Sequence, residues 1–135
     1  MNKQMKEVRK RLLTDFDFYS KSALKIRTKE GKIHPLKLNA AQTILNEAVE
    51  GQLATEGKIR IIILKARQQG LSTYTGGYLY YSVSQKAARK AMVITHHADS
   101  TRALFDMTKR FHEHCPEILK PHTEYSSRRE ISFDV

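Results

Sequence analysis

The chain has 135 residues, of which 24 are basic and 14 are acidic, and its formal net charge at pH 7 is +10. This length fits one domain with a core of its own, and the positive charge favours polyanionic partners, nucleic acid above all. The single cysteine, Cys115, excludes a disulfide within the chain and suits a reducing compartment. No stretch reaches the roughly 20 apolar residues of a membrane span. The charged first residues lack an apolar core and indicate no secretory signal.

The N-terminal segment is strongly basic, with one acid, Glu7, among residues 1–11. Met5, Val8 and Leu12 fall three and four residues apart, which predicts a basic amphipathic helix or a frayed arm. This segment either contacts DNA or a partner subunit, or it is merely a solvated tail. Both interpretations stay open. We treat residues 1–28 as this N-terminal helix or arm and residues 29–135 as the main unit.

A helix is expected to begin after Asn39 as its cap and to end near Glu50, with Gly51 just beyond it. The residues at helical spacing on its apolar face are Ala41, Ile44, Leu45 and Ala48. Gln42 projects from the first turn, off that face. Its amide offers a donor and an acceptor side by side, a pair that matches the N6 and N7 edge of adenine. A solvent-facing helix glutamine is the alternative.

The most informative segment is residues 59–73. A run of β-branched residues over 59–64 predicts a buried strand. A polar loop with one glycine, Gly70, follows it, and the hydroxyl pair Ser72 and Thr73 opens a helical pattern. A strand, a loop and a helix N-terminus in this order bind phosphate, because the free N–H groups of the first turn and the helix dipole favour an anion. An ordinary strand–turn–helix with a basic loop is the alternative.

The usual phosphate loop reads G-x-x-x-x-G-K-[ST]. In the same frame, Lys65 replaces the first glycine and Leu71 replaces the lysine, while Gly70 stands in place. Such a loop needs a hydroxyl for Mg²⁺, here from Ser72 or Thr73, and a cation near the β and γ phosphates. The cation then comes from the beginning of the loop. Lys65 is preferred over Arg67, because a lysine acts on phosphate as a mobile point charge.

A second helix is expected over residues 71–90. The residues on its inward face are Leu71, Tyr74, Tyr78 and Tyr81, and core packing explains them better than base stacking. Gly76 and Gly77 interrupt this helix, which indicates close packing against a sheet. A second strand is expected over residues 91–95. Strand, helix and strand then form a βαβ unit with parallel strands and a right-handed crossover.

A third helix is expected after residues 96–100, with Asp99 or Ser100 as its cap, and it ends near Pro116. The residues that it carries inward are Leu104, Met107 and Phe111. The histidines and the cysteine near its end are His112, His114, Cys115 and His122. Their spacing does not match the common zinc frames. Histidines near the negative pole of a helix are the better interpretation.

The run Lys-Ala-Arg-Gln-Gln-Gly-Leu-Ser-Thr at residues 65–73 resembles the deviant Walker A loop of the large terminase subunits of tailed bacteriophages. These are the ATP-driven motors that pack DNA into capsids. Residues 34–42 resemble the family's adenine-binding segment, and residues 91–96 resemble the next strand of its ATPase core. Residues 126–133 resemble the strand region after that. The resemblance covers roughly residues 16–135.

The resemblance implies an α/β, P-loop NTPase-like fold, in which helices flank a parallel sheet, with residues 29–135 as the N-terminal part of the ATPase domain. It implies ATP and Mg²⁺ as cofactors, with Gln42 on adenine and Ser72 on the metal. The loop residues implied to bind phosphate are Lys65, Arg67, Gln68, Gln69, Gly70, Leu71, Ser72 and Thr73. In related motors the loop after the second strand faces DNA, so His96, His97 and Arg102 are candidates for DNA contact or coupling.

The partners implied by the resemblance are double-stranded DNA, the small terminase subunit, the portal protein and further copies of the chain. The location implied is the cytoplasm of a bacterial host, without a membrane. A motor of this class also needs a strand that ends in acidic residues, for Mg²⁺ and for the attacking water, and in the family a nuclease domain follows. Neither is legible. We therefore assign no catalytic residue and expect the chain alone to be inactive as an ATPase, as the N-terminal piece of a longer protein or a truncated prophage remnant.

Two other functions fit the same residues. One is a helicase-like DNA- or RNA-dependent ATPase, which shares the glutamine and the loop. The other is a non-catalytic basic module for DNA binding or assembly, in which the phosphate loop is vestigial.

Overall fold

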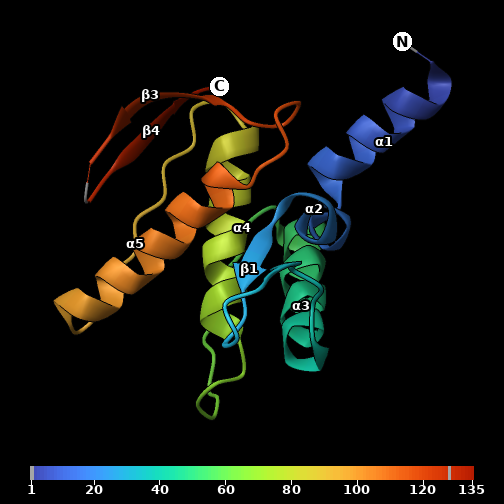
Figure 1. The fold of residues 1–135 in the computed structure, drawn as a ribbon. Coiled ribbons are helices and arrows are strands. Elements are labelled where there is room, and N and C mark those ends of the chain that lie inside the picture. The colour runs from blue at the N-terminus through green and yellow to red at the C-terminus, as the bar shows by residue number, and fades with distance from the viewer. Residues whose placement is uncertain (1, 128) are drawn as a thin grey trace.

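The computed structural model describes residues 2–127 and 129–135. Over these residues the protein is a mixture of helices and small antiparallel sheets (Figure 1). The elements in chain order are α1 (Lys3–Thr14), α2 (Phe16–Ala23), β1 (Lys25–Arg27), β2 (Ile33–Pro35), α3 (Ala40–Glu56), α4 (Leu71–Gln85), α5 (Ala98–Glu113), β3 (His122–Ser126) and β4 (Ile131–Asp134). None of the described helices is long and apolar enough to cross a bilayer.

Helix α4 lies at the centre of the molecule, with α3 on one side and α5 on the other (Figure 1). The largest buried side chains of the core are Phe16, Tyr19, Leu24, Leu36, Tyr74, Tyr80, Tyr81 and Phe111. The expected core role of the tyrosines is confirmed, because Tyr74 and Tyr81 are almost fully buried and Tyr78 packs against the same cluster. The ring of Phe16 meets those of Tyr74 and Tyr78 edge to face, a favourable arrangement for aromatic pairs.

Helix α3 is capped by Asn39 as expected, but it continues beyond Gly51 to Glu56. Gly57 ends it in the left-handed conformation, with φ +69°. A glycine inside a helix costs only about 1 kcal/mol relative to alanine, so Gly51 does not terminate a helix whose following residues are good helix formers.

The buried face of α3 also differs from the expected one. Its buried residues are Gln42, Asn46 and Val49, whereas Ile44 is 69% exposed. The polar residues are buried because α4 supplies hydrogen-bond partners: Tyr74 donates its hydroxyl proton to Asn46 Oδ1 at 2.7 Å. A buried amide with such a partner avoids the cost of an unsatisfied group.

Residues 59–64 and 91–95 are not strands in this structure, contrary to the expected parallel βαβ unit. The described strands instead form two antiparallel pairs, β1 with β2 and β3 with β4. A strand exists only where its backbone groups meet a hydrogen-bonded neighbour, and neither segment has a paired neighbour among the described residues. Several of their apolar side chains are therefore left exposed, Ile62 and Leu64 completely and Met92 and Ile94 to 81% each, whereas Ile59 and Ile61 pack partly against the core.

Helix α5 begins after His97, whose Nδ1 accepts a hydrogen bond from the N–H of Asp99 at 3.2 Å. The cap is therefore His97, not Asp99 or Ser100. Phe111 is fully buried, as expected. Near the end of the chain, β4 pairs antiparallel with β3. Of the segment expected to be a strand over 126–133, Ser126 ends β3, residues 131–133 lie in β4, and Arg128 lies outside the described residues.

The basic N-terminal segment forms α1, as expected, and none of its residues is buried. It extends away from the rest of the molecule (Figure 1). Residues of α2, in contrast, share the core of α4, since the rings of Tyr19 and Tyr81 lie 4.7 Å apart.

The glycines of α3 and α4 give a paired test of packing. A Cβ at Gly77 would lie 2.9 Å from Cδ1 of the fully buried Leu24, whereas a Cβ at Gly51 would meet nothing within 4 Å. The close packing expected at Gly77 is therefore against Leu24, not a sheet. Gly51→Ala should raise the free energy of unfolding by about 0.5–1 kcal/mol through helix propensity. Gly77→Ala should lower it by about 1 kcal/mol or more, because overpacking outweighs that gain.

Urea unfolding of the two variants and the parent measures both effects, provided that the m value is unchanged. Equal stabilisation by both substitutions would show that α4 does not pack on Leu24 as described.

Candidate functional site

The loop over residues 65–70 leads into the N-terminus of α4 and lies at one end of the molecule (Figure 1). Two of its residues are in the left-handed conformation, Gln68 with φ 59° and Gly70 with φ +76°. This conformation costs a residue with a side chain roughly 1–2 kcal/mol and is readily adopted by glycine. The loop therefore turns sharply just before the helix, and it does so at a local cost.

The first N–H groups of α4 have no protein acceptor among the described residues. The backbone ladder of the helix begins with the bond from Tyr74 N to Gly70 O, at 3.0 Å, and no side chain caps the helix. The N–H groups of residues 71–73 precede that bond and remain orphaned, as at any uncapped helix start. Together with the helix dipole they form a favourable position for an anion.

Two amide side chains at the start of α3, those of the cap Asn39 and of Gln42, bind the backbone of this turn. Gln42 donates from Nε2 to the carbonyl of Gly70 at 2.7 Å, and Asn39 donates from Nδ2 to the carbonyl of Gln69 at 3.2 Å. The same side chains form a capping box, in which Asn39 Oδ1 accepts from Gln42 N and Gln42 Oε1 accepts from Asn39 N, each at 2.9 Å. Asn39 was missed as a site residue: its spacing to Gln42 indicates the cap, but no local pattern indicates the contact with the loop.

These contacts explain the glycine of the loop. A Cβ at Gly70 would lie 2.8 Å from Gln42 Nε2 and 3.3 Å from Asn39 Nδ2, and its positive φ would strain any other residue. Gln42 itself is 4% exposed, not free in solvent. After its two hydrogen bonds, its amide keeps one N–H and one oxygen lone pair. Its contact with adenine stays a prediction.

The side chains expected to bind phosphate lie on different sides of this turn. Those of Lys65, Arg67, Gln68, Gln69 and Ser72 are exposed, Thr73 is half-buried, and Leu71 is 7% exposed and packs inward. Lys65 and Ser72 line the same cavity, of about 1280 Å³, whereas Arg67 does not line it.

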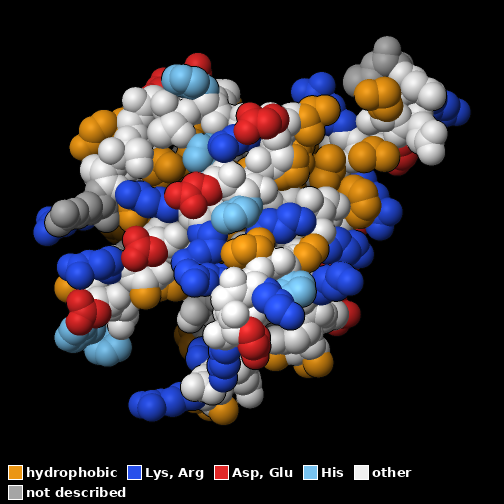
Figure 2. Space-filling model, viewed as in Figure 1, with side chains coloured by type: hydrophobic (Ala, Val, Ile, Leu, Met, Phe, Trp, Pro, Cys, Tyr) orange, Lys and Arg blue, Asp and Glu red, His pale blue; other side chains and the backbone are white. Residues whose placement is uncertain are grey.

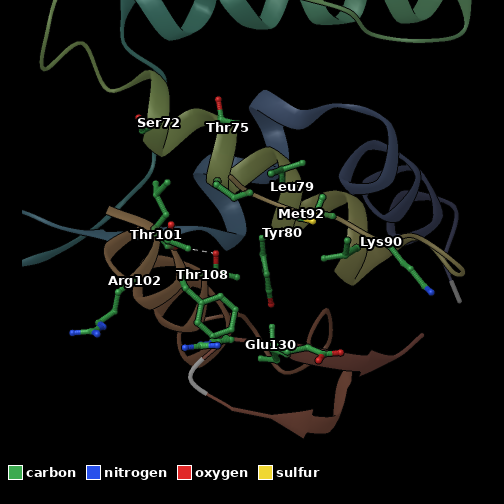
Figure 3. Close-up of a pocket in the computed structure, with 18 of the residues that line it drawn as sticks. Ser72, Thr75, Leu79, Tyr80, Lys90, Met92, Thr101, Arg102, Thr108 and Glu130 are labelled. Carbon is green, nitrogen blue, oxygen red and sulfur yellow. Dashed lines mark hydrogen bonds between the residues drawn. The ribbon is translucent and has the colours of Figure 1, made fainter. Parts of the chain in front are cut away.

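The cavity extends from Ser72 and Thr75 at the start of α4, past Tyr80 and Met92, to Glu130 at its far end (Figure 3). Its walls come from α4, α5, residues 89–93 and the start of β4. Five of its lining residues are basic, namely Lys65, Arg89, Lys90, Arg102 and Arg129, and one is acidic, Glu130. This balance favours an anionic ligand.

The histidines near the end of α5 have structural partners. His112 lies between the hydroxyls of Tyr80, 3.0 Å from Nδ1, and Thr123, 2.8 Å from Nε2. His114 contacts the backbone carbonyl of Arg110. Within the described part of the chain, no three His, Cys, Asp or Glu side chains are placed to share a metal ion. His112 therefore connects α4 and α5 to the β3–β4 hairpin.

The loop after residues 91–95 provides the cap of α5. His97 lies 3.7 Å from the carboxylate of Asp99, which Arg102 approaches to 4.0 Å. His96 is exposed beside them. The expected DNA contacts of His96, His97 and Arg102 stay predictions.

Comparison with known proteins found no protein-family model that matches the chain and no curated protein with significant similarity to it. The interpretation of the site rests on its residues and its geometry.

His112 predicts a pH dependence of stability. Burial, and secondarily the charge of Lys120, holds the pKa of His112 below its usual value. The unfolded chain then binds more protons than the folded one below about pH 6.5, so the free energy of unfolding should fall as the pH drops through that value. His112→Gln should flatten this part of the profile, because glutamine keeps polar groups but does not titrate.

Urea unfolding of the parent and the variant on both sides of about pH 6.5 tests this prediction. His114→Gln, which replaces an exposed neighbour, is the control and should leave the profile unchanged. Identical profiles for all three proteins would contradict the role of His112.

Proposed function

We propose that the chain binds the triphosphate of ATP, together with Mg²⁺, at residues 65–73, as the ATP-binding part of a large terminase that drives the packaging of double-stranded DNA. The observation that carries the proposal is the N-terminus of α4, which has no side-chain cap and which the left-handed Gly70 immediately precedes. Ser72 and Lys65 line the cavity beside it. The resemblance of residues 65–73 to the terminase loop supports the same assignment.

In this proposal each part of the loop has one task. The orphaned N–H groups at the start of α4 bind phosphate oxygens, Ser72 offers a hydroxyl to Mg²⁺, and Lys65 supplies the cation near the β and γ phosphates. Gln42 contacts the adenine edge with the N–H and the lone pair that its other contacts leave free. Small terminase subunit and portal protein are the protein partners that the resemblance adds.

The P-loop architecture is part of the proposal. Residues 59–64 and 91–95 precede and follow α4, as two strands of a βαβ unit do. We propose that they pair as parallel strands in the working state. Their exposed apolar side chains support this arrangement, because pairing in a sheet covered by helices removes such side chains from water.

A non-catalytic basic module is the second candidate. Helix α1 exposes basic side chains along its length and buries none of its residues, and Lys and Arg side chains gather across the middle of the face in Figure 2. Both features suit a nucleic-acid backbone without any nucleotide chemistry. Titration with ATP separates the two functions, because the basic module gains no affinity from the loop.

The first prediction from the proposed function concerns Gly70. Gly70→Val should weaken the binding of Mg²⁺-ATP more than tenfold, because a branched side chain strains the positive φ and collides with Gln42 and Asn39. Gly57→Val is the matched control: Gly57 also has a positive φ, but a Cβ there meets nothing within 4 Å. Isothermal titration of the parent and both variants measures the effect, and equal affinities of the parent and Gly70→Val would remove the loop from the proposal.

The second prediction concerns the phosphate cation. Lys65→Ala should weaken the binding of Mg²⁺-ATP about tenfold, and Arg67→Ala should weaken it less, because Lys65 lines the cavity beside Ser72 and Arg67 does not. The binding of adenosine, which carries no phosphate, is the reference for both variants. The reverse order of effects would transfer the role to Arg67.

A further inference from the structure

We infer that Asn39 and Gln42 are positioning residues of the phosphate loop, because they hold the carbonyls of Gln69 and Gly70 against α3 and so turn the N–H groups of Gly70 and Leu71 toward the phosphates. The inference rests on the proposed function and adds residues that act on the ligand through the backbone.

The argument begins with the geometry of the peptide bond. In a trans peptide, the C=O of one residue and the N–H of the next point in opposite directions, and no described peptide bond is cis. Asn39 Nδ2 binds the carbonyl of Gln69, so the N–H of Gly70 points away from α3. Gln42 Nε2 binds the carbonyl of Gly70, which also accepts from Tyr74 N, and the two bonds together point the N–H of Leu71 out of the start of the helix. Two successive donors therefore point away from the side chains of Asn39 and Gln42.

The backbone at this turn needs such a restraint. Glycine has wide conformational freedom, and a rotated peptide between Gln69 and Gly70 would present a carbonyl oxygen to the anion in place of an N–H. The bonds from α3 favour the donor arrangement before any ligand arrives. The gain in affinity is one of preorganisation.

The chemistry of the two side chains is selective. Serine or aspartate caps a helix as well as asparagine, and glutamate completes a capping box as well as glutamine. Ionised aspartate and glutamate have no donor for a carbonyl, and the short hydroxyl of serine, which can donate, does not extend to the turn as the asparagine amide does. Only amides at positions 39 and 42 serve both the cap and the loop, since each accepts from the backbone of α3 and donates to the backbone of the turn.

The test removes the donor and keeps the cap. Asn39→Ser is neutral and still caps α3, but it cannot reach Gln69 as a donor. Asn2→Ser makes the same change at the cap of α1, far from the loop in sequence. Inorganic tripolyphosphate with Mg²⁺ is the probe. Asn39→Ser should bind it about fivefold more weakly than the parent, the effect of one hydrogen bond of about 1 kcal/mol, and Asn2→Ser should bind it as the parent does.

A second pair of variants tests the same inference if Asn39→Ser does not fold. Gln42→Glu keeps the acceptor of the capping box and loses the donor to Gly70. Thr43→Glu adds the same charge on the next, exposed residue of α3. Gln42→Glu should bind tripolyphosphate at least fivefold more weakly than Thr43→Glu. The backbone amide signals of Gly70 and Leu71, observed by NMR, should shift on addition of tripolyphosphate in the parent and shift less in Asn39→Ser and Gln42→Glu.

The outcomes separate the inference from the proposed function. Binding by the parent with equal affinities in each variant and its control would overturn the positioning role and leave the ATP site standing. A parent that binds neither tripolyphosphate nor ATP would overturn both. Weaker binding confined to Asn39→Ser and Gln42→Glu, with smaller shifts at Gly70 and Leu71, would support both.

Discussion

The hydrogen bonds from the amide side chains of α3 to α4 and to the turn before it are the contacts on which the candidate site depends. Asn39 and Gln42 hold the turn, and Asn46 accepts the hydroxyl proton of Tyr74 further along α4. These positions recur at three- and four-residue intervals on one face of α3. Because buried amides must find partners, they set the register between the two helices more strictly than an apolar face would. The same hydrogen bonds therefore also fix the position of the loop relative to α3.

The other side of α4 is organised differently. Tyr80 packs there against Phe111 of α5, but the cavity beside the helix remains large, and residues 59–64 and 91–95 leave apolar side chains in water. Exposed apolar surface costs roughly 25 cal/mol per Å², so pairing of these segments is favourable wherever partners for their backbones exist. The N-terminal end of α4 is fixed from the α3 side, independently of that pairing.

The sequence predicted local features well and distant contacts poorly. The Asn39 cap, the start of α4 at Leu71 and the core role of the tyrosines follow from spacing within a few residues, and the structure confirms them. Spacing also placed Ile44 on the buried face of α3 and Gln42 off it, whereas Ile44 is exposed and Gln42 is buried. Which face of a helix is buried depends on its partner. The contacts of Asn39 and Gln42 with the turn join residues 28 or 30 positions apart, which no local period encodes. The expected strands failed for the same reason, because pairing depends on neighbours.

The loop departs from the usual phosphate-binding pattern at two positions, Lys65 and Leu71. The packing of α4 accounts for the second departure and bears on the first. The position that usually carries the lysine holds Leu71, which is 7% exposed and packs inward. Leu71 fills this position at the edge of the cavity, and a lysine there would have to bury the stem of its side chain, so an apolar residue suits this helix start better. Under the proposed function the cation then comes from another part of the loop, and Lys65 lines the cavity that Ser72 also lines. The first glycine of the pattern is dispensable because Gln68 and Gly70 provide the left-handed turn. Under the proposed function, the relocated cation and the buried Leu71 are therefore two consequences of one helix packing its first turn into the core.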